Sequence, residues 1–291
     1  QKPVRGAATP IISTMSLARR PRELWSASYL FSYLMECIIE FVPKEATIIS
    51  PEKIDENDKK SEVGLYPDRI FIKDMELSMI NEMTEKALKK FSERIKISLE
   101  DVKNYFNIMG VSLKAEYDKE TIDTLNKRLT VLELNNRTVT NQAYERVNEL
   151  IQNVTHSPLF PHTFDRGIFQ SLAKIATHEL KDKLMEEKDD DVIYKQIKDK
   201  RISGYKSYHK YFCIVYADGD NISKIVSSLD DGKLEKFSGN LLQFGISAFD
   251  IIKKYGGMPI YAGGDDLLFI APVASSPNNN IFNLISQLDD I

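Results

Sequence analysis

The hydrophobic pattern of residues 1–115 predicts helices and strands packed around one sheet. After Trp25, apolar side chains recur at steps of three and four residues, the period of one helical face, and Pro43 ends the pattern. A second helical pattern runs from residue 75 to about residue 101. The short β-prone runs that predict strands lie at residues 46–50, 68–73 and 105–114.

Residues 116–205 are polar and form a predicted helical insertion with a charged linker. Helical patterns cover 118–165, apart from a Pro-containing loop at 157–161, and continue over 167–187. The segment 186–210 is dominated by charge, with an acidic run followed by scattered lysines and an arginine. Two interpretations stay open for this segment: a solvated linker, or a basic surface that binds RNA.

Residues 206–291 follow the order strand, helix, helix, strand, turn, strand. The run 211–216 is continuously β-prone, as expected of a strand that is buried on both faces. A turn leads into a short helix from Ile222, and a longer helix spans about 233–254 before a pair of glycines ends it. Two further apolar runs predict the last strands, and they lie at 258–262 and 267–271.

The composition is that of an ordinary globular protein. Hydrophobic residues make up 42% and charged residues 28% of the 291 positions. No apolar run approaches the roughly 18 residues that a membrane span needs, so we expect no membrane partner and a cytoplasmic location. The net charge of −4 means that any attraction to nucleic acid must come from local basic patches. Cys37 and Cys213 alone cannot form a zinc site, so we expect no zinc.

A glycine-rich turn carries the first candidate chemistry. Gly263 and Gly264 supply the backbone freedom of a tight turn, and Asp265 and Asp266 follow directly. Neighbouring carboxylates at such a turn repel each other, and a hard divalent cation such as Mg²⁺ or Mn²⁺ removes that repulsion. Taken alone, the segment could equally be an ordinary hairpin turn without function.

Asp218 is the second candidate, because it comes directly after the strand predicted at 211–216. A strand beside the hairpin would bring Asp218 against Asp265 and Asp266. Two metals about 3.5–4 Å apart on such carboxylates stabilise both the attacking and the leaving oxygen of a phosphoryl transfer. We therefore predict that Asp218, Asp265 and Asp266 are catalytic and bind the metals. Asp218 alone could instead cap the next helix, but the two motifs together favour the metal site.

The segment after Asp218 predicts a site for a triphosphate. Free N–H groups and the dipole at a helix start attract anions, and Gly219 would leave room for phosphates. Asp220 could instead cap the helix, and Lys224 could reach a phosphate or remain a solvated surface lysine. The predicted nucleotide-binding residues are Gly219, Asp220, Asn221, Ile222, Ser223, Gly263 and Gly264.

Both acidic motifs resemble those of one protein family. Residues 211–226, with Ala-Asp-Gly-Asp-Asn-Ile-Ser-Lys, and residues 261–270, with Ala-Gly-Gly-Asp-Asp-Leu-Leu, resemble the large palm-domain subunit of type III CRISPR effector complexes, in the Cmr (III-B) branch. Further similar segments are Leu17–Ser28, which contains Arg-Arg-Pro-Arg-Glu-Leu-Trp, Pro67–Ile70 and Ser171–Ala176. The resemblance therefore extends over most of the chain.

The resemblance implies an α+β fold in which two ferredoxin-like palm domains face each other across a nucleotide site. Residues 1–115 would form the first, non-catalytic palm, residues 116–205 the helical insertion between the palms, and residues 206–291 the second palm. We expect the sequence to be part of a longer chain, because a complete palm would need a further strand after Ile291.

The resemblance also implies an RNA-activated nucleotidyltransferase with two Mg²⁺ or Mn²⁺ ions. Pairing of guide RNA with target RNA would activate the site, which would condense ATP into cyclic oligoadenylate or a related adenylated second messenger for antiviral defence. The 3′-hydroxyl of one ATP would attack the α-phosphate of another, and pyrophosphate would leave. The implied partners are guide RNA, target RNA and the other subunits of a Cmr complex.

Some features depart from the family pattern and leave alternatives open. No His-Asp pair occurs, so we expect no DNA cleavage, and Ser223 stands where the family usually has a glycine. One alternative is a free-standing nucleotide cyclase, although such enzymes often have a glutamate where this chain has Asp266. Another is a non-catalytic scaffold of a ribonucleoprotein, against which the three intact acids argue.

Overall fold

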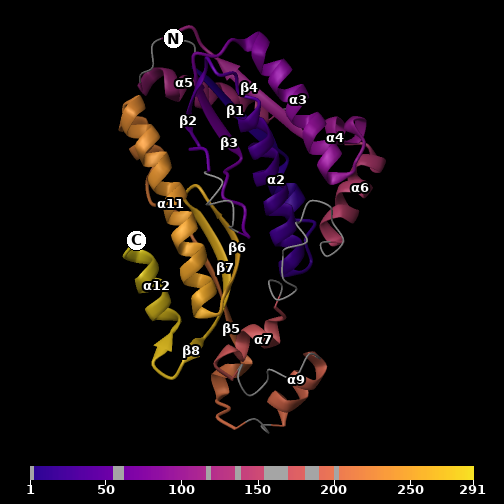
Figure 1. Ribbon diagram of the computed structural model, residues 1–291, viewed down its shortest axis with the longest axis vertical. Coiled ribbons are helices and arrows are strands. Elements are labelled where there is room, and N and C mark those ends of the chain that lie inside the picture. The colour runs from indigo at the N-terminus through magenta and orange to yellow at the C-terminus, as the bar shows by residue number, and fades with distance from the viewer. Residues whose placement is uncertain are drawn as a thin grey trace.

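The computed structural model describes residues 3–54, 62–115, 119–134, 139–153, 170–180, 190–199 and 203–291. These residues form a four-stranded and a three-stranded antiparallel sheet with helices against them, and a short two-stranded one, which confirms the expected α+β class (Figure 1). The elements of the first part of the chain are β1 (Val4–Thr9), α1 (Ile11–Met15), α2 (Pro21–Glu40), β2 (Thr47–Ser50), β3 (Arg69–Lys73), α3 (Leu77–Ile95), α4 (Leu99–Tyr105) and β4 (Asn107–Ser112).

Helices dominate the middle of the chain, and a second sheet follows them. The middle elements are α5 (Lys119–Glu133), α6 (Asn141–Gln152), α7 (Leu172–Ala176), η4 (His178–Leu180), α9 (Asp190–Lys198) and η5 (Ser207–Lys210). The last elements are β5 (Phe212–Ala217), α10 (Ile222–Ser228), α11 (Asp231–Tyr255), β6 (Met258–Gly263), β7 (Asp266–Pro272), β8 (Ala274–Ser276), β9 (Asn279–Asn280) and α12 (Ile281–Asp289). Among the described residues, every helix is too short or too polar to cross a membrane.

The first sheet has the strand order β2-β3-β1-β4, and all its neighbouring strands are antiparallel. The hydrophobic pattern does not predict the central strand β1, because its sequence is Val-Arg-Gly-Ala-Ala-Thr. These small residues have a packing reason. A Cβ on Gly6 would lie 3.1 Å from the Ile70 side chain and 3.2 Å from the Met109 carbonyl oxygen, so the sheet is tight at its centre.

The prediction of one continuous helix from 75 to about 101 is wrong, because the segment forms two helices, α3 and α4. Lys96 adopts a left-handed conformation (φ 58°) and ends α3. Ser98 then caps α4, with its hydroxyl oxygen accepting a hydrogen bond from the Asp101 backbone N–H at 3.1 Å. A Ser followed three residues later by an acid is a recognised helix-start signal, and the periodicity of apolar residues conceals it here.

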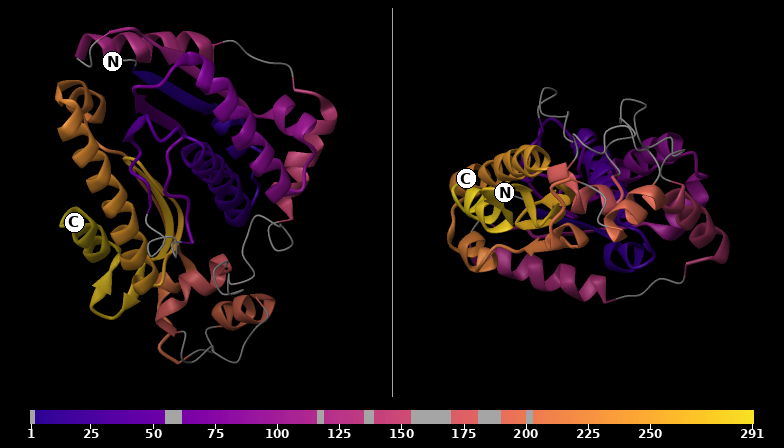
Figure 2. Two further views of the ribbon diagram at one scale, coloured as in Figure 1. Left: turned by 45° about the horizontal axis from the view of Figure 1, so that its top comes forward. Right: turned by 90° about the horizontal axis from the view of Figure 1, so that it is seen from below.

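α2 is buried on most of its sides because it lies between the two sheets. It contacts β1 of the first sheet and β6 of the second, and it crosses between them in the left view of Figure 2. Trp25 and Phe31 on this helix are each 1% exposed, so both belong to the core. The indole N–H of Trp25 still finds a partner, the Glu62 carbonyl oxygen at 2.8 Å.

The charged segment 186–210 contains more structure than a solvated linker would. Over part of it α9 forms, and Ile193 on this helix is only 1% exposed. Ile193 packs with Ala173 and Leu180 in a small separate apolar cluster. Periodic apolar positions among the charges therefore decide the local structure. The loop predicted at 157–161 lies outside the described residues.

The second sheet has the order β5-β7-β6, so the predicted strand β5 does lie beside the hairpin. The prediction that β5 is buried on both faces is wrong: Ile214 is 66% exposed and Tyr216 65% exposed. Within the described residues β5 pairs with β7 alone, and alternate side chains point to opposite faces of the strand. One face packs into the core through Cys213 and Val215, and the other face stays accessible.

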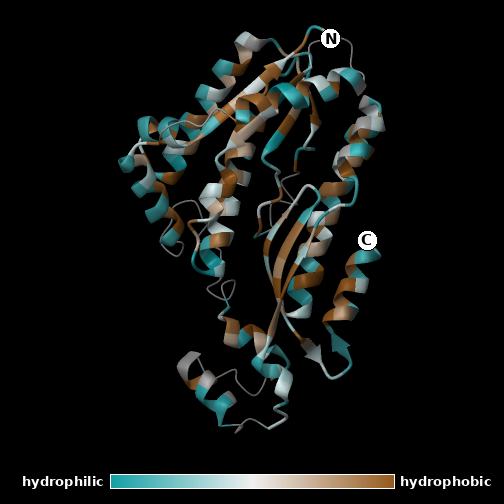
Figure 3. Ribbon diagram, turned by 180° about the vertical axis from the view of Figure 1, so that it is seen from behind, coloured by the Kyte–Doolittle hydropathy of each residue, from teal (hydrophilic) through white to brown (hydrophobic). Residues whose placement is uncertain are grey.

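α11 joins the two halves of the molecule. Towards its start, Leu234 and Phe237 pack with α5 and with one face of the first sheet. Its later residues Ala248 and Ile252 belong to the core beneath the second sheet. Figure 1 shows this helix running along both sheets, and Figure 3 shows hydrophobic residues concentrated along the strands that it covers. α11 therefore packs one apolar cluster against the first sheet and a second beneath the second sheet, and this second cluster also contains Trp25 of α2.

This shared core generates a prediction for Phe269→Ala. Phe269 lies on β7 and is 0% exposed, so removing its ring should lower the free energy of unfolding by about 3–5 kcal/mol. Trp25, the single tryptophan, reports on the other half of the core. In urea unfolding, its fluorescence transition should therefore shift together with the circular dichroism signal.

The control is Phe282→Ala, because Phe282 is 75% exposed and should change stability by no more than about 0.5 kcal/mol. If Phe269→Ala left the Trp25 transition unchanged while the circular dichroism signal shifted, the two halves would unfold independently and the shared core would be refuted.

Candidate active site

The register between β5 and β7 brings two of the predicted acids together. The ladder ends with Ala217 opposite Leu267, so the next position along places Asp218 opposite Asp266. Directly opposed residues of antiparallel strands have Cβ atoms about 4.5–5.5 Å apart. The charge of Asp218 accordingly raises the pKa of Asp266. The pair at this end of the sheet is therefore Asp218 and Asp266.

Asp265 lies in the turn before β7 and meets the loop that follows β5. A Cβ on Gly219 would come within 2.8 Å of the Asp265 Cβ and 2.5 Å of an Ile222 side-chain carbon. The absence of a side chain at Gly219 is thus required by close packing of the two loops. We predicted room for phosphates from this glycine, and the structure supplies this second reason for it.

The neighbouring acids and burial together raise the pKa of Asp266. Burial raises the pKa of Asp266 first, the hydrogen bond from Tyr216 lowers it, and the charges of Asp265 and Asp218 raise it further, so the net direction is upward. Asp265 and Asp218, whose charges raise the pKa of Asp266, are themselves acids. A bound cation would relieve the repulsion among these neighbouring carboxylates.

Tyr216 is a site residue that the motif analysis misses. Its hydroxyl donates to Asp266 Oδ1 at 2.7 Å, and this bond, together with the charge of Asp266, raises the pKa of Tyr216 to about 12. The signal was its spacing. Tyr216 is two positions before Asp218 on a strand, and such residues share a face of the sheet.

The donor set fits Mg²⁺ or Mn²⁺ in its chemistry, since carboxylate oxygens are the ligands that these ions prefer. Asp218 and Asp266 would be the facing ligands, with Asp265 on the adjoining turn. Among the described residues, however, no group of three or more His, Cys, Asp or Glu side chains is already gathered closely enough to hold a metal. The fit therefore rests on the neighbouring carboxylates and on the repulsion between them.

The predicted nucleotide-binding segment forms the start of α10, which spans seven residues. Its N-cap is Asn221, in a left-handed conformation (φ 59°), so the alternatives in which Asp218 or Asp220 caps this helix are wrong. Lys224 donates from Nζ to Asn221 Oδ1 at 3.0 Å and thereby reinforces the turn. Ser223 lies in the first turn of the helix. The binding of nucleotide by this segment stays a prediction.

The turn that carries Asp265 contacts the first half of the chain. Gly264 has the positive φ (65°) that a glycine tolerates, and a Cβ there would lie 3.7 Å from Pro67. A Cβ on Gly263 would lie 2.9 Å from the Tyr261 hydroxyl oxygen. Burial, and then the charge of nearby Asp68, raises the pKa of Tyr261. The acidic turn therefore lies against residues from both the first and the second half of the chain.

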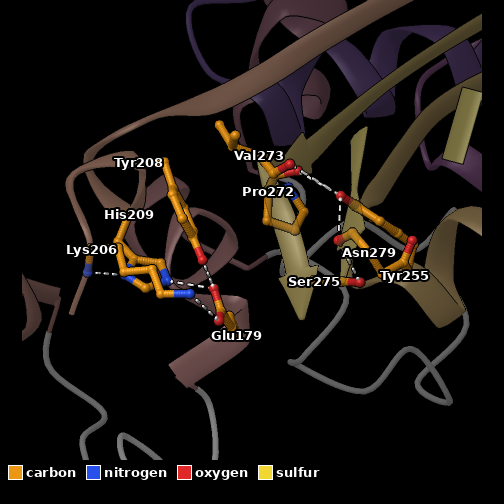
Figure 4. Close-up of polar contacts among 9 residues, drawn as sticks. All are labelled: Glu179, Lys206, Tyr208, His209, Tyr255, Pro272, Val273, Ser275 and Asn279. Atoms are coloured by element: carbon orange, nitrogen blue, oxygen red, sulfur yellow. Dashed lines mark hydrogen bonds and ion pairs between the residues drawn. The ribbon is translucent and has the colours of Figure 1, made fainter. Parts of the chain in front are cut away.

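A polar cluster fastens the other end of β5, next to its first residue (Figure 4). His209 is fully buried, accepts the Lys206 backbone N–H at Nδ1 (2.9 Å) and lies 2.9 Å from Glu179 Oε2 through Nε2. Tyr208 donates to the same carboxylate oxygen. Burial alone would raise the pKa of Glu179, but these bonds and the Lys206 charge outweigh it and lower that pKa.

A second group of polar contacts holds the connection after β7. The Tyr255 hydroxyl, at the end of α11, lies 3.3 Å from the Val273 carbonyl oxygen and 3.5 Å from that of Asn279 (Figure 4). Both groups lie away from the acids. They fix the end of the sheet opposite the candidate site, so that the loops carrying the acids start from strands of defined position.

A pocket of about 240 Å³ lies on the accessible face of the second sheet, against the segment that enters α2. Leu268, which pairs with Tyr216, is part of its wall. The pocket thus begins two residues along β7 from Asp266. Its lining is mostly apolar, with basic residues from the segment before α2, and consists of Ala18, Arg19, Arg20, Pro21, Leu24, Ile214, Ile260, Leu268 and Ile270.

A β-α-α-β-β unit with acids at the ends of adjacent strands is the arrangement of a palm domain. Comparison with family models agrees: residues 211–290 match Cas10/Cmr2, second palm domain, and residues 4–104 match CRISPR-associated protein Cmr2, N-terminal. Together the two matches cover more than half of the chain. The chain therefore belongs to the Cas10/Cmr2 family of type III CRISPR systems, as its motifs predict. No curated protein matches the sequence.

Solved structures share the fold at low sequence identity. The type III-B Cmr-beta complex in its apo state gives a TM-score of 0.59 at 10% identity, over 99% of this chain and 60% of that chain. The Csm1-Csm4 subcomplex of a type III-A complex gives 0.56 at 11% identity, over 99% and 47%. A Csm1-Csm4 cassette in complex with pppApA gives 0.55 at 11% identity, over 99% and 46%. This chain spans at most three fifths of the length of these relatives.

The close contact at Gly219 generates a prediction for Gly219→Ala. The new methyl group would meet the Asp265 Cβ, which is tied to the backbone, so the two loops must separate. We expect the free energy of unfolding to fall by about 1–3 kcal/mol in urea denaturation.

The matched control is Gly232→Ala in the first turn of α11, where the nearest atom to the added Cβ is 4.0 Å away. That change should leave stability equal or raise it by up to about 1 kcal/mol, because alanine favours helix. Equal stabilities of the two variants would show that the loops around Gly219 are loosely packed.

Proposed function

We propose that this chain is the nucleotide-polymerising subunit of a type III-B CRISPR effector complex. The observation that carries the proposal is the β5–β7 register, which ends with Ala217 opposite Leu267 and so brings Asp218 next to Asp266, while Gly219 packs against Asp265. Acids from two separate loops thus meet at one end of one sheet. This is the arrangement that a two-metal phosphoryl transfer requires.

Two palm domains facing each other are part of the proposal. In the first half, the order β1-α2-β2-β3-α3-β4 with sheet order β2-β3-β1-β4 is the β-α-β-β-α-β pattern of ferredoxin-like folds. The second half repeats its first part, with β5, α11, β6 and β7 in the sheet order β5-β7-β6. The division into palms at 1–115 and 206–291, with the insertion at 116–205, follows from this repetition as a proposal.

The proposed reaction joins nucleotides through a 3′–5′ bond. The 3′-oxygen of one nucleotide forms a bond to the α-phosphorus of another, the bond from that phosphorus to the β-phosphate oxygen breaks, pyrophosphate leaves, and the hydroxyl proton passes to solvent. Asp218 and Asp266, with Asp265 beside them, would hold Mg²⁺ or Mn²⁺. When bound, such ions lower the pKa of the attacking hydroxyl and stabilise the charge on the leaving oxygen. Gly219, Asp220, Asn221, Ile222 and Ser223 would lie along the triphosphate.

ATP is the proposed substrate, and RNA the proposed activator. Relatives of the same fold were solved as a Csm1-Csm4 cassette with AMPPNP, with one ATP and with pppApA, all of which are adenine nucleotides. Another was solved as a Cmr-beta complex bound to cognate target RNA. By analogy we propose guide RNA, target RNA and other Cmr subunits as partners of this chain, in the cytoplasm, with cyclic oligoadenylate or a related adenylated messenger as product.

The test uses the assembled complex with α-labelled ATP, Mg²⁺ or Mn²⁺, and cognate target RNA, with products resolved by mass spectrometry. We expect adenylate products that depend on target RNA. Asp218→Ala and Asp266→Ala should each lower the rate by about 10²–10³-fold or more, because each removes preorganised charge from the transition state. Asp289→Asn, a neutralised exposed acid on α12, is the control and should keep the wild-type rate.

The other outcomes distinguish the alternatives. Consumption of GTP without any RNA would favour a free-standing cyclase. An intact, RNA-bound complex that consumes no nucleotide at all would contradict the proposal and leave a scaffold subunit. The control variant also matters here, since an equal loss of activity in Asp289→Asn would point to a general effect of charge.

A further inference from the structure

Tyr216 has a defined geometric relation to the acids. It stands on β5 opposite Leu268, so Asp266 is its diagonal neighbour on β7. Aromatic side chains reach such diagonal positions across antiparallel strands. The bond of 2.7 Å from the Tyr216 hydroxyl to Asp266 Oδ1 is therefore a consequence of register and spacing.

We propose that Tyr216 is a positioning residue, which orients Asp266 for a divalent cation by holding one of its two oxygens. The inference rests on the proposed function, because it assigns Tyr216 a role at that same site. A carboxylate accepts hydrogen bonds and cations through both oxygens, so a bond to Oδ1 leaves the second oxygen for a cation. Tyr216 itself need not touch metal or nucleotide.

The need for such a residue follows from the facing acids. Like charges directly opposite each other on antiparallel strands repel, so the Asp266 side chain would rotate away from Asp218 if nothing held it. Asp218 directly follows the last residue of β5 and is two positions after Tyr216, so the alternation of the strand would put both side chains on the same face. A neutral donor on that face draws Asp266 towards Asp218 and keeps the two carboxylates convergent without adding a positive charge that would compete with a cation.

A purely structural role does not explain the contact. The Tyr216 side chain is 65% exposed, and its hydroxyl would find water if Asp266 were absent. The ring is not part of the buried core. Loss of the hydroxyl should therefore leave folding unchanged, while it frees Asp266 to adopt other rotamers. We therefore expect the loss of the hydroxyl to weaken cation binding. Loss of a group that hydrogen-bonds to a metal ligand typically lowers metal affinity by about 10–100-fold.

The experiment compares Tyr216→Phe with wild type by titrating the purified full chain with Mn²⁺ and following free Mn²⁺ by electron paramagnetic resonance. We expect Mn²⁺ binding to weaken by about tenfold, with an unchanged thermal midpoint. Tyr211→Phe is the matched control, because Tyr211 precedes the same strand, is 63% exposed and makes no described contact with the acids. It should bind Mn²⁺ as wild type does.

Activity of the assembled complex supplies a second readout. Tyr216→Phe should need about tenfold more Mn²⁺ for half-maximal rate and recover nearly the wild-type rate at saturating Mn²⁺, since every group that touches the metal remains. Wild-type Mn²⁺ affinity in Tyr216→Phe would overturn the positioning role and leave the proposed function intact. The remaining outcome is that wild type binds no Mn²⁺, or binds it no more tightly than Asp266→Asn does. That result would refute the metal site, and with it both the proposed function and this inference.

Discussion

The burial of α2 between two sheets is the constraint on which the rest of the structure depends. Because the helix is covered on both sides, the segment that follows β2 must run closely along it. A Cβ on Gly64 would lie 2.8 Å from the Ser32 Cβ, and the Tyr66 backbone N–H donates to the Ser32 hydroxyl at 2.9 Å. Pro67 comes next and meets the turn at Gly264. The segment from Gly64 to Pro67 thus connects the packing of the core helix to the turn that carries the acids.

The second sheet has one end that is fastened and one that is open for chemistry. At the fastened end, the buried His209 and Glu179 satisfy each other's polar groups, and such satisfied clusters are rigid. At the open end, Asp218 and Asp265 lie beside Asp266, and their negative charges raise its pKa. Acids clustered at a strand end repel one another and lower stability, so stability alone does not explain them. The contrast supports a functional reading of the open end.

Much of the fold follows from local patterns. The long helices α2 and α11, the hairpin of β6 and β7, and the αL glycine that ends α11 all agree with the sequence, because periodicity and helix-stop signals are local properties. The predictions fail where packing decides. β1 is made of small residues that suit a tight sheet centre, and β5 looks like a buried strand although Ile214 and Tyr216 lie on an accessible face. Composition cannot tell how many neighbours a strand will have.

The sequence by itself determined the chemistry of the candidate site: which residues carry carboxylates, which glycines allow a tight turn, and that both motifs follow strands. The same residues also indicate the family to which the chain belongs. Only the tertiary structure decided that the end of β5 brings Asp218 next to Asp266, that Gly219 packs closely against Asp265, and that the Tyr216 hydroxyl donates to Asp266. The physical reason is that these contacts depend on the register between strands 50 residues apart, as Tyr216 and Asp266 are. Such a register is set by the burial of a whole sheet face, which no local window of sequence contains.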